Sequence, residues 1–556
     1  MPGKAQPHEA AKIERYVLEG FDGGLHSEGA FSKVHISDTE CTCAENIEFW
    51  PVGTITKRKG RSYKNLGDQL SGAITQVYQW WSEAGANYLL VFTAACAVSG
   101  TPPAAMGTPI SGGVYYYLPA AGTSGTFVPI LSAGRVAADV DGWTPTLDED
   151  IRVETFGGSA IWTDGKDAIY SYSGTTCCAI DDAPVGAVCI KGYKNYLFVG
   201  NCEEPNGGGN RHLSRIYWSN PADANVWPAT NYLDLDGDDG DLITGMDVLG
   251  NELIVFKERK IFAITYVGGV YEFLAESRAN GVGCAAGGSI VPIFNELLFY
   301  GTESFYSFNG REVESLSDKL KDIITANINP TYRDKIQGLT YEDKDQAWFL
   351  TPITQTASGN SHCLILDYER DSWTIFSNPA ACLSWYTKST DTTFGDLVAA
   401  YETYDVTWGA RSFDSNSAQI ITGTYDGYLL DNGTIGLTDD LGSDYEGFWR
   451  SRWLDFGMPD INKRITRMTI LVDKEAASLA TSYNLNVKIY KDWDQSAPAY
   501  TKTVAMYGSY PVLERRLDFT MSCRVMQIEI GTTKKAQSFT IHKIIIEYLP
   551  KGRTIV

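Results

Sequence analysis

The sequence predicts an all-β chain, and three observations lead to this prediction. Short runs of β-branched and aromatic residues are bounded by Gly, Asn and Asp, a pattern typical of strands rather than helices. A two-part unit, an Asn-x-Leu run followed by a second aromatic run, begins at Asn195, Asn251 and Asn295. The chain is also rich in Gly (54), Tyr (32), Phe (22) and Trp (14), which suits short strands joined by tight turns. A unit that recurs at roughly 40–50 residues and holds several strands is typical of β-propeller blades.

The remaining elements follow from weaker copies of the same unit. Another Asn-x-Leu run starts at Asn87 as one arm of a hairpin, and one further hairpin and two weaker units bring the prediction to about seven blades. A helix is expected at 316–328, where Ser315 and Asp318 resemble a capping pair and Pro330 ends the apolar pattern. The predicted runs are 195–199 with 215–218, 251–256 with 260–264, 295–300 with 304–308, 75–81 with 87–93, 160–163 with 168–172, 346–350 with 363–368 and 372–376, and 397–401 with 419–422 and 428–430.

Composition divides the chain into three expected parts. Residues 1–65 carry few regular signals and are predicted to be an N-terminal extended segment. Residues 66–440 hold the propeller, which ends in a stretch rich in Gly, Asp and Ser. Residues 441–556 change to longer alternating strands, which indicate a C-terminal β-sandwich.

Charge is spread unevenly along the chain. The net charge is −22, yet residues 448–556 hold 17 basic and 10 acidic residues, so that this end carries +7 and the rest −29. An acidic body argues against a grip on DNA, but a wall that repels phosphate lets DNA pass without adhering.

No apolar run approaches the roughly 18–20 residues that cross a bilayer, and residues 1–15 lack the apolar core of a secretory signal. We therefore expect no membrane insertion and a cytoplasmic site of synthesis.

Motifs for catalysis and cofactors are missing from the sequence. The 11 cysteines and 6 histidines have no metal-ligand spacing, and no nucleophile elbow, P-loop or dinucleotide fingerprint occurs. We expect no catalytic residues, no metal and no cofactor.

One acidic run could nevertheless hold calcium. Its carboxylates belong to Asp234, Asp236, Asp238, Asp239 and Asp241. An EF-hand loop that started at Asp234 would need Gly at its sixth position and Glu at its twelfth, where the chain has Asp239 and Gly245. A solvated acidic turn is the simpler interpretation.

The basic C-terminal end offers a second candidate site. Five of its residues could dock on an acidic neighbour, such as the body of another subunit. They could equally be ordinary solvated residues of sandwich strands. The five are Arg450, Arg452, Lys463, Arg464 and Arg467.

A propeller can also act on carbohydrate. A glycoside hydrolase would need two carboxylates that face one pocket, which a sequence cannot establish. Abundant Tyr and Trp could form sugar platforms, although aromatics at strand spacing are more simply explained as packing between blades. A carbohydrate-binding or carbohydrate-active propeller stays an alternative to a protein without catalysis.

Four parts of the chain resemble the tail hub, or nozzle, proteins of short-tailed bacteriophages, which stabilise the filled head. The likeness spans most of the chain, and its motifs are structural rather than catalytic. It is carried by residues 21–25 (Phe-Asp-Gly-Gly-Leu) with 44–46 and 53–60, by 215–219 (Arg-Ile-Tyr-Trp-Ser) with 227–228 and 238–245, by 305–310 (Phe-Tyr-Ser-Phe-Asn-Gly) with the helix after it, and by 452–457 (Arg-Trp-Leu-Asp-Phe-Gly).

The resemblance implies a structural virion protein that forms a homo-hexamer. Six copies would form a ring below the head-to-tail adaptor protein, extend the DNA channel, help retain the genome and anchor tail fibres, spikes or a tail needle. Double-stranded DNA would pass through without sequence-specific binding. The protein would assemble in the host cytoplasm and reside in the phage tail.

Overall fold

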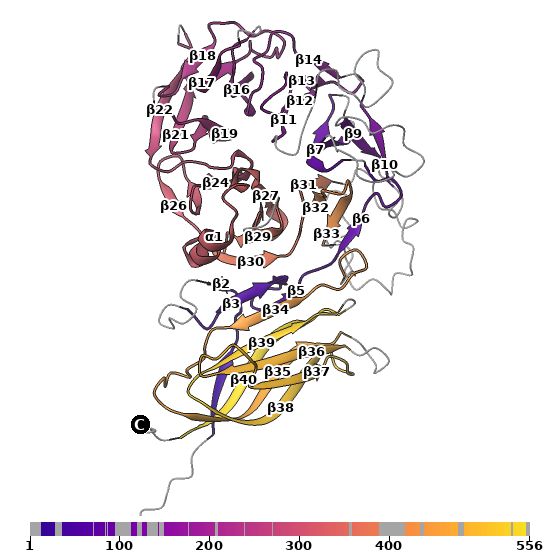
Figure 1. Ribbon diagram of the computed structural model, residues 1–556, viewed down its shortest axis with the longest axis vertical. Coiled ribbons are helices and arrows are strands. Elements are labelled where there is room, and N and C mark those ends of the chain that lie inside the picture. The colour runs from indigo at the N-terminus through magenta and orange to yellow at the C-terminus, as the bar shows by residue number, and fades with distance from the viewer. Residues whose placement is uncertain are drawn as a thin grey trace, which may run out of the picture. The chain divides into compact units, whose positions relative to one another are not determined.

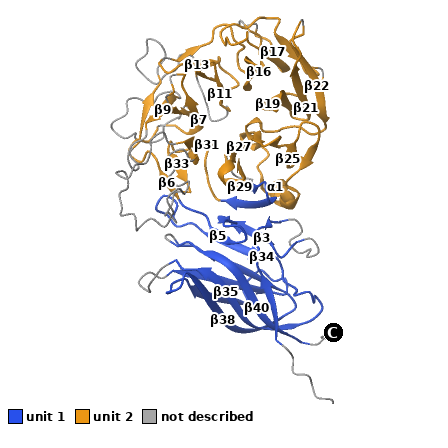
Figure 2. Cartoon of the chain, turned by 180° about the vertical axis from the view of Figure 1, so that it is seen from behind, with its two compact units in different colours: residues 1–60, 366–376, 436–556 blue, residues 61–365, 377–435 orange. Residues whose placement is uncertain are grey.

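A computed structural model describes most of the chain in two compact units. Unit 1 comprises residues 1–60, 366–376 and 436–556, and unit 2 comprises 61–365 and 377–435 (Figure 2). The described residues are 13–27, 36–70, 72–83, 85, 87–94, 113–118, 125–130, 143, 150–175, 177–205, 209–237, 239–269, 271–354, 359–387, 418–433, 439–475, 483–534 and 537–551.

The described part of unit 2 contains six antiparallel sheets of four strands each. In sheet order they are β10 (Thr126–Pro129), β9 (Gly113–Leu118), β8 (Asn87–Thr93) and β7 (Ile74–Trp81); β11 (Arg152–Phe156), β12 (Ser159–Thr163), β13 (Tyr170–Tyr172) and β14 (Cys177–Ala179); β15 (Cys189–Tyr193), β16 (Tyr196–Glu203), β17 (Arg211–Trp218) and β18 (Tyr232–Asp234); β19 (Ile243–Leu249), β20 (Glu252–Lys257), β21 (Lys260–Tyr266) and β22 (Phe273–Asn280); β23 (Val291–Ile293), β24 (Glu296–Tyr300), β25 (Phe305–Phe308) and β26 (Val313–Ser315); and β31 (Cys382–Thr387), β32 (Ala418–Gly423), β33 (Leu429–Asn432) and β6 (Arg61–Tyr63). Three more strands, β27 (Gln337–Tyr341), β28 (Gln346–Thr351) and β29 (His362–Asp367), are neighbours in that order at one end of a ten-stranded sheet.

These sheets form a closed ring (Figure 1). With one exception, one edge strand of each sheet contacts the corresponding edge strand of the next sheet. The contacts run β7–β11–β15–β19 and β23–β27–β31, and β31 in turn contacts β7 of the first sheet. The exception is the step from β19 to the sheet β23–β26, where the short 3-10 turn η1 (Gly287–Ser289) contacts both β19 and β24. β6 precedes all the other strands of unit 2 yet pairs with β33, so an early and a late segment share one sheet. The predicted all-β propeller is therefore confirmed as a class of fold.

The three strong repeats of the sequence are the central strand pairs of three sheets. They correspond to β16 with β17, β20 with β21, and β24 with β25. β16 is buried at all but its last residue, and β20 and β24 at all but their first. Because central strands are covered on both faces, they form continuous apolar runs that a sequence reveals. The outer strands β18, β22 and β26 consist almost entirely of exposed or half-buried residues and leave a weaker pattern.

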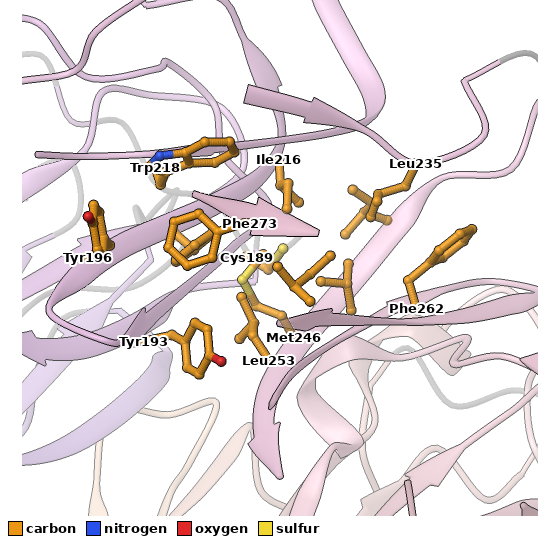
Figure 3. Close-up of a cluster of buried hydrophobic side chains, with 14 residues drawn as sticks. Cys189, Tyr193, Tyr196, Ile216, Trp218, Leu235, Met246, Leu253, Phe262 and Phe273 are labelled. Atoms are coloured by element: carbon orange, nitrogen blue, oxygen red, sulfur yellow. The ribbon is translucent and has the colours of Figure 1, made fainter. Parts of the chain in front are cut away.

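Aromatic side chains fill the space between neighbouring sheets, as predicted. One cluster joins the sheet β15–β18 to the sheet β19–β22 (Figure 3). Phe273 lies at its centre, with ring centroids 4.9 Å from Phe198 and 5.2 Å from Trp218, both in edge-on orientations. Edge-to-face pairs at this distance add to the free energy that burial of the rings provides.

Other predicted elements occur with altered bounds. The hairpins at 75–81 with 87–93 and at 160–163 with 168–172 are the pairs β7–β8 and β12–β13. The predicted helix is shorter: a 3-10 turn, η2 (Asp318–Leu320), leads into α1 (Lys321–Asn327), which buries Ile324. Two further turns are η3 (Arg333–Lys335) and η4 (Glu342–Lys344). The run 397–401 lies outside the described residues. No helix among the described residues has the length and apolar character needed to span a membrane.

The described strands of unit 1 belong to two sheets. The first has the order β38–β35–β40–β5–β4, with β1 on β40; the second runs β30–β3–β34–β39–β36–β37, with β2 parallel to β3. β38 alternates buried and exposed residues along most of its length, so that one face of its sheet is covered. The strands are β1 (Glu14–Leu18), β2 (Gly24–Leu25), β3 (Glu40–Glu45), β4 (Ile47–Glu48), β5 (Ile55–Lys57), β30 (Ser372–Phe376), β34 (Gly447–Ser451), β35 (Lys463–Asp473), β36 (Asn484–Lys491), β37 (Tyr500–Ala505), β38 (Val512–Cys523), β39 (Met526–Thr532) and β40 (Thr540–Pro550).

The N-terminal residues are part of the same unit as the C-terminal strands, which differs from the predicted division at 1–65, 66–440 and 441–556. β1 pairs with β40 from Glu14 opposite Tyr548, and β3 pairs with β34 from Glu45 opposite Phe448. Residues 366–376 also belong to unit 1. Pairing between strands about 400 and more positions apart leaves no local signal in a sequence, because each short strand is stabilised only by its distant partner.

Glu475, which follows β35, gives unit 1 a predicted pH dependence. Burial, together with the nearby charge of Asp473, raises the pKa of Glu475 to about 7. Because the folded-state pKa exceeds the unfolded one, this group stabilises unit 1 below pH about 4.5, and that contribution is lost as pH rises to about 7. We expect Glu475→Gln to stabilise unit 1 above pH 7 by up to about 3 kcal/mol relative to the parent, with little difference near pH 4. Urea unfolding across this pH range measures the difference, and a constant gap between parent and variant would contradict the assignment.

Candidate functional site

The acidic run between β18 and β19 is built around a buried lysine. The side chain of Lys257, at the end of β20, is 0% exposed. Its Nζ donates to both carboxylate oxygens of Asp239, at 2.8 and 2.9 Å, and to the carbonyl oxygens of Leu235 at 3.0 Å and Asp236 at 3.4 Å. An ammonium group thus takes the oxygen ligands that a bound calcium ion would need.

Other cations bind two further carboxylates of the run, those of Asp236 and Asp234. Lys260 Nζ lies 3.0 Å from carboxylate oxygens of both Asp236 and Asp239, and Arg215 binds both carboxylate oxygens of Asp234, at 2.6 and 2.9 Å. Partial burial acts to raise the pKa of Asp239, but hydrogen bonds from Lys257, the Asp241 amide and Lys260 outweigh it and lower that pKa.

The last two residues of the predicted set differ in what the structure shows of them. Asp241 accepts hydrogen bonds from the backbone amides of Leu242 and Arg259. Asp238 lies outside the described residues. The run is therefore an internally paired loop, which neither the calcium nor the solvated-turn interpretation included.

Four of the five basic residues proposed for docking have partners within unit 1. Arg450 pairs with Glu529, and Arg452 donates to Asp38 at 2.7 Å. Lys463 is fully buried and donates to the carbonyl oxygens of Met458 and, at 2.7 Å, Arg524. Arg467 binds Asp518 at 2.6 Å. Arg464 is exposed on β35. The structure does not bring the five together as one free basic surface.

A charged network in the centre of the propeller ring was not predicted. Lys191 Nζ, on β15, lies 3.0 Å from Asp247 Oδ1 on β19 and 3.5 Å from Glu154 Oε2 on β11. Desolvation acts to lower the pKa of Lys191, but the two carboxylates outweigh it and raise that pKa. Burial raises the pKa of Glu154. The three residues come from the first strands of three consecutive sheets, so they link those sheets around the axis.

The N-terminal stretches that carry the phage-protein resemblance have structural roles in unit 1. Gly24 has φ +72°, and a Cβ there would lie 2.6 Å from the backbone nitrogen of Trp373, so only glycine fits. Phe21 is fully buried against Trp449, with ring centroids 5.4 Å apart. Arg58, which is 3% exposed, binds Asp440 through both terminal nitrogens and donates from Nε to Asn46 Oδ1 at 2.7 Å.

The described residues offer little for metal or thiol chemistry. No three His, Cys, Asp or Glu side chains among them group as a metal site requires. Ten described cysteines are free, and eight of them are buried. Burial raises the pKa of Cys43 to about 11 and of Cys189 to about 12, so these thiols are protonated at neutral pH and weak as nucleophiles.

One cavity of about 450 Å³ occurs among the first strands β23, β27 and β31. Its lining includes Val291, Leu339, Tyr341, Glu342, Asp343 and Trp385. No pattern in the sequence indicates this site, because its residues come from three sheets and form no motif.

Comparisons with known proteins give distant structural likenesses only. No family model matches the chain, and no curated protein matches it. Among solved structures, the chain is similar to the Neurospora crassa Pan2 WD40 domain, with 6% identity and a TM-score of 0.36 over 68% of this chain and 96% of that one. It is also similar to the N-terminal domain of Nup159, with 10% identity and a TM-score of 0.32 over 71% and 99% of the two chains. A glycoside hydrolase gives 9% identity and a TM-score of 0.25 over 86% and 98%. Likenesses this weak carry no functional argument, and the fold rests on the sheets described above.

Proposed function

We propose that this protein is a structural component of a phage tail, a hub or nozzle that assembles as a homo-hexamer below the head-to-tail adaptor. The observation that carries the proposal is where the negative charge lies. Unit 2 holds 42 acidic and 21 basic residues, a net charge of −21, whereas unit 1 carries −1. An acidic ring repels DNA phosphates, so a channel bordered by such rings would let the genome pass without adhering.

The finer architecture belongs to the same proposal. The six four-stranded sheets and the sheet β27–β29 are the seven blades of the propeller, and the two sheets of unit 1 pack as a β-sandwich. Unit 1, which carries little net charge, would be the unit that contacts the adaptor or the tail fibres. The protein resides in the virion and performs no catalysis.

The arrangement of ionisable groups favours architecture over catalysis. The buried charges of Lys257 and Arg58, and the half-buried charge of Lys191, are held by partners on neighbouring strands or loops. Such pairs are costly to break and hold a fold in one geometry. Within the described residues of the acidic run, Asp234, Asp236 and Asp239 are bound by cations and Asp241 by backbone amides, which leaves that run poorly suited to general acid–base work.

A second candidate, a carbohydrate-binding or carbohydrate-active propeller in the tail, is favoured by one observation. Trp385 is 43% exposed in the wall of the cavity that Glu342 and Asp343 also line. An aromatic platform beside carboxylates is one arrangement that binds sugars. A panel of surface polysaccharides tests this candidate: binding or cleavage that Glu342→Gln with Asp343→Asn abolishes would favour it over the hub.

Copy number tests the hub directly. We expect six copies of this chain per purified particle, measured by quantitative mass spectrometry against the adaptor protein. A chain that remains monomeric and binds glycan would contradict the proposal.

A further inference from the structure

The cavity among β23, β27 and β31 lies beside a close approach of two strands. Gly338 has no side chain, and a Cβ there would lie 2.3 Å from Val291 Cγ2, so β27 approaches β23 closely. Thr340 Oγ1 donates a hydrogen bond of 2.8 Å to the carbonyl of Pro292. The volume of about 450 Å³ falls within the range of about 300–1,000 Å³ found for small-molecule sites. The ring therefore contains a space of the size that a small organic group needs.

One wall of the cavity is an exposed indole. Trp385 is 43% exposed, while its neighbours Ser384 and Tyr386 on β31 are buried. Tyr386 packs into the core with Ile74 and Val77, on the opposite face of the strand. Trp385 is thus directed away from this core. The face of an indole attracts cations as well as flat apolar groups.

The charge of the lining selects between ligand classes. Glu342 and Asp343 border the cavity, and among the described residues that line it none is basic. Unit 2 as a whole carries −21. Anions are therefore repelled, and a cation gains from both the local carboxylates and the field of the whole unit. Val291 and Leu339 add an apolar surface beside these charges.

We propose that the cavity binds a guanidinium or ammonium group on an aliphatic stem. The stem contacts Val291 and Leu339, and the cation lies between Trp385 and the carboxylates of Glu342 and Asp343. Such a group occurs on arginine and lysine side chains and on free polyamines. The proposal does not depend on the tail-hub function, because it rests on the cavity alone.

Two probes of equal shape test the proposal by calorimetry on the full chain. One is N-acetyl-arginine methylamide, and the other is its citrulline counterpart, which lacks the charge. We expect saturable binding of the arginine probe that weakens with added salt, and at least about tenfold weaker binding of the citrulline probe. Trp385→Ala should weaken arginine binding by roughly 5- to 30-fold. Glu342→Gln with Asp343→Asn, which preserves side-chain shape, should abolish the preference for arginine.

A matched control is available in the same unit. Trp81 on β7 is 49% exposed and does not line the cavity, so Trp81→Ala should leave arginine binding unchanged. Circular dichroism of each variant checks the fold. Spermidine as a third probe distinguishes the two sources: tighter binding than the arginine probe assigns a free polyamine, and weaker binding assigns a protein-borne side chain.

Several results would overturn the proposal. These are equal binding of the arginine and citrulline probes, no saturable binding of the arginine probe, or an equal loss in Trp81→Ala and Trp385→Ala. Binding of a neutral sugar, without arginine binding, that Trp385→Ala removes would assign the cavity to carbohydrate instead.

Discussion

Deletion of residues 1–60 should unfold unit 1 while unit 2 keeps its own thermal transition. The deletion removes β1, β2, β3, β4 and β5, which belong to both sheets of unit 1. β3 lies between β30 and β34, so its loss splits one sheet, and the loss of β1 and β5 exposes the backbone of β40. Unpaired strand edges and uncovered apolar faces cost far more than a single contact.

Calorimetry and hydrogen exchange measure this outcome. We expect one transition instead of two, and loss of amide protection along β34 and β40. A separately added peptide of residues 1–60 should restore protection by pairing with the same strands. Deletion of residues 448–556 should have a comparable effect on the N-terminal strands, because it removes their partners. Unchanged protection of β40 in the protein that lacks residues 1–60 would show that the N-terminal strands do not stabilise unit 1.

Replacement of Lys257 by Met should destabilise unit 2 by about 3–5 kcal/mol, because it leaves the Asp239 carboxylate and two carbonyl groups without their buried cation. Met has nearly the shape of Lys, so the loss reports the charge rather than a cavity. Lys260→Met is the matched control: this lysine also binds Asp239 but is 26% exposed, and we expect a clearly smaller loss.

Chemical denaturation of both variants measures the difference in unfolding free energy. Calcium should not raise the melting temperature of the parent protein, because an ammonium group already occupies the oxygen ligands. A higher melting temperature with calcium than with chelator would contradict this description of the loop. Equal stability of parent and Lys257→Met would show that the buried ion pair contributes no net stability.

The sequence predicted those elements whose burial leaves a local pattern. Asn195, Asn251 and Asn295 begin repeats that became central strand pairs, because both faces of those strands are covered. β6 has only three residues and is stabilised by β33, so its role in closing the ring could not be read from the sequence. The N-terminal strands were missed for the same reason.

The candidate site was predicted in part. The acidic run stood out as a cluster of carboxylates, but its cation was not assigned, because only the register of β20 places Lys257 inside the loop. Glu154, Lys191 and Asp247 are single charges on three sheets and form no motif in the sequence. For Arg450, Arg452, Lys463 and Arg467, charge alone suggested docking, while their partners within unit 1 required the fold.

Cryo-electron microscopy of a particle that contains this chain is the decisive test of the proposed tail-hub function. We expect a sixfold ring of this protein beneath the adaptor, with one propeller in each subunit and density for DNA that is not fixed to the ring. A reconstruction that places the chain elsewhere, as a monomer or at the tip of a receptor-binding fibre, would contradict it.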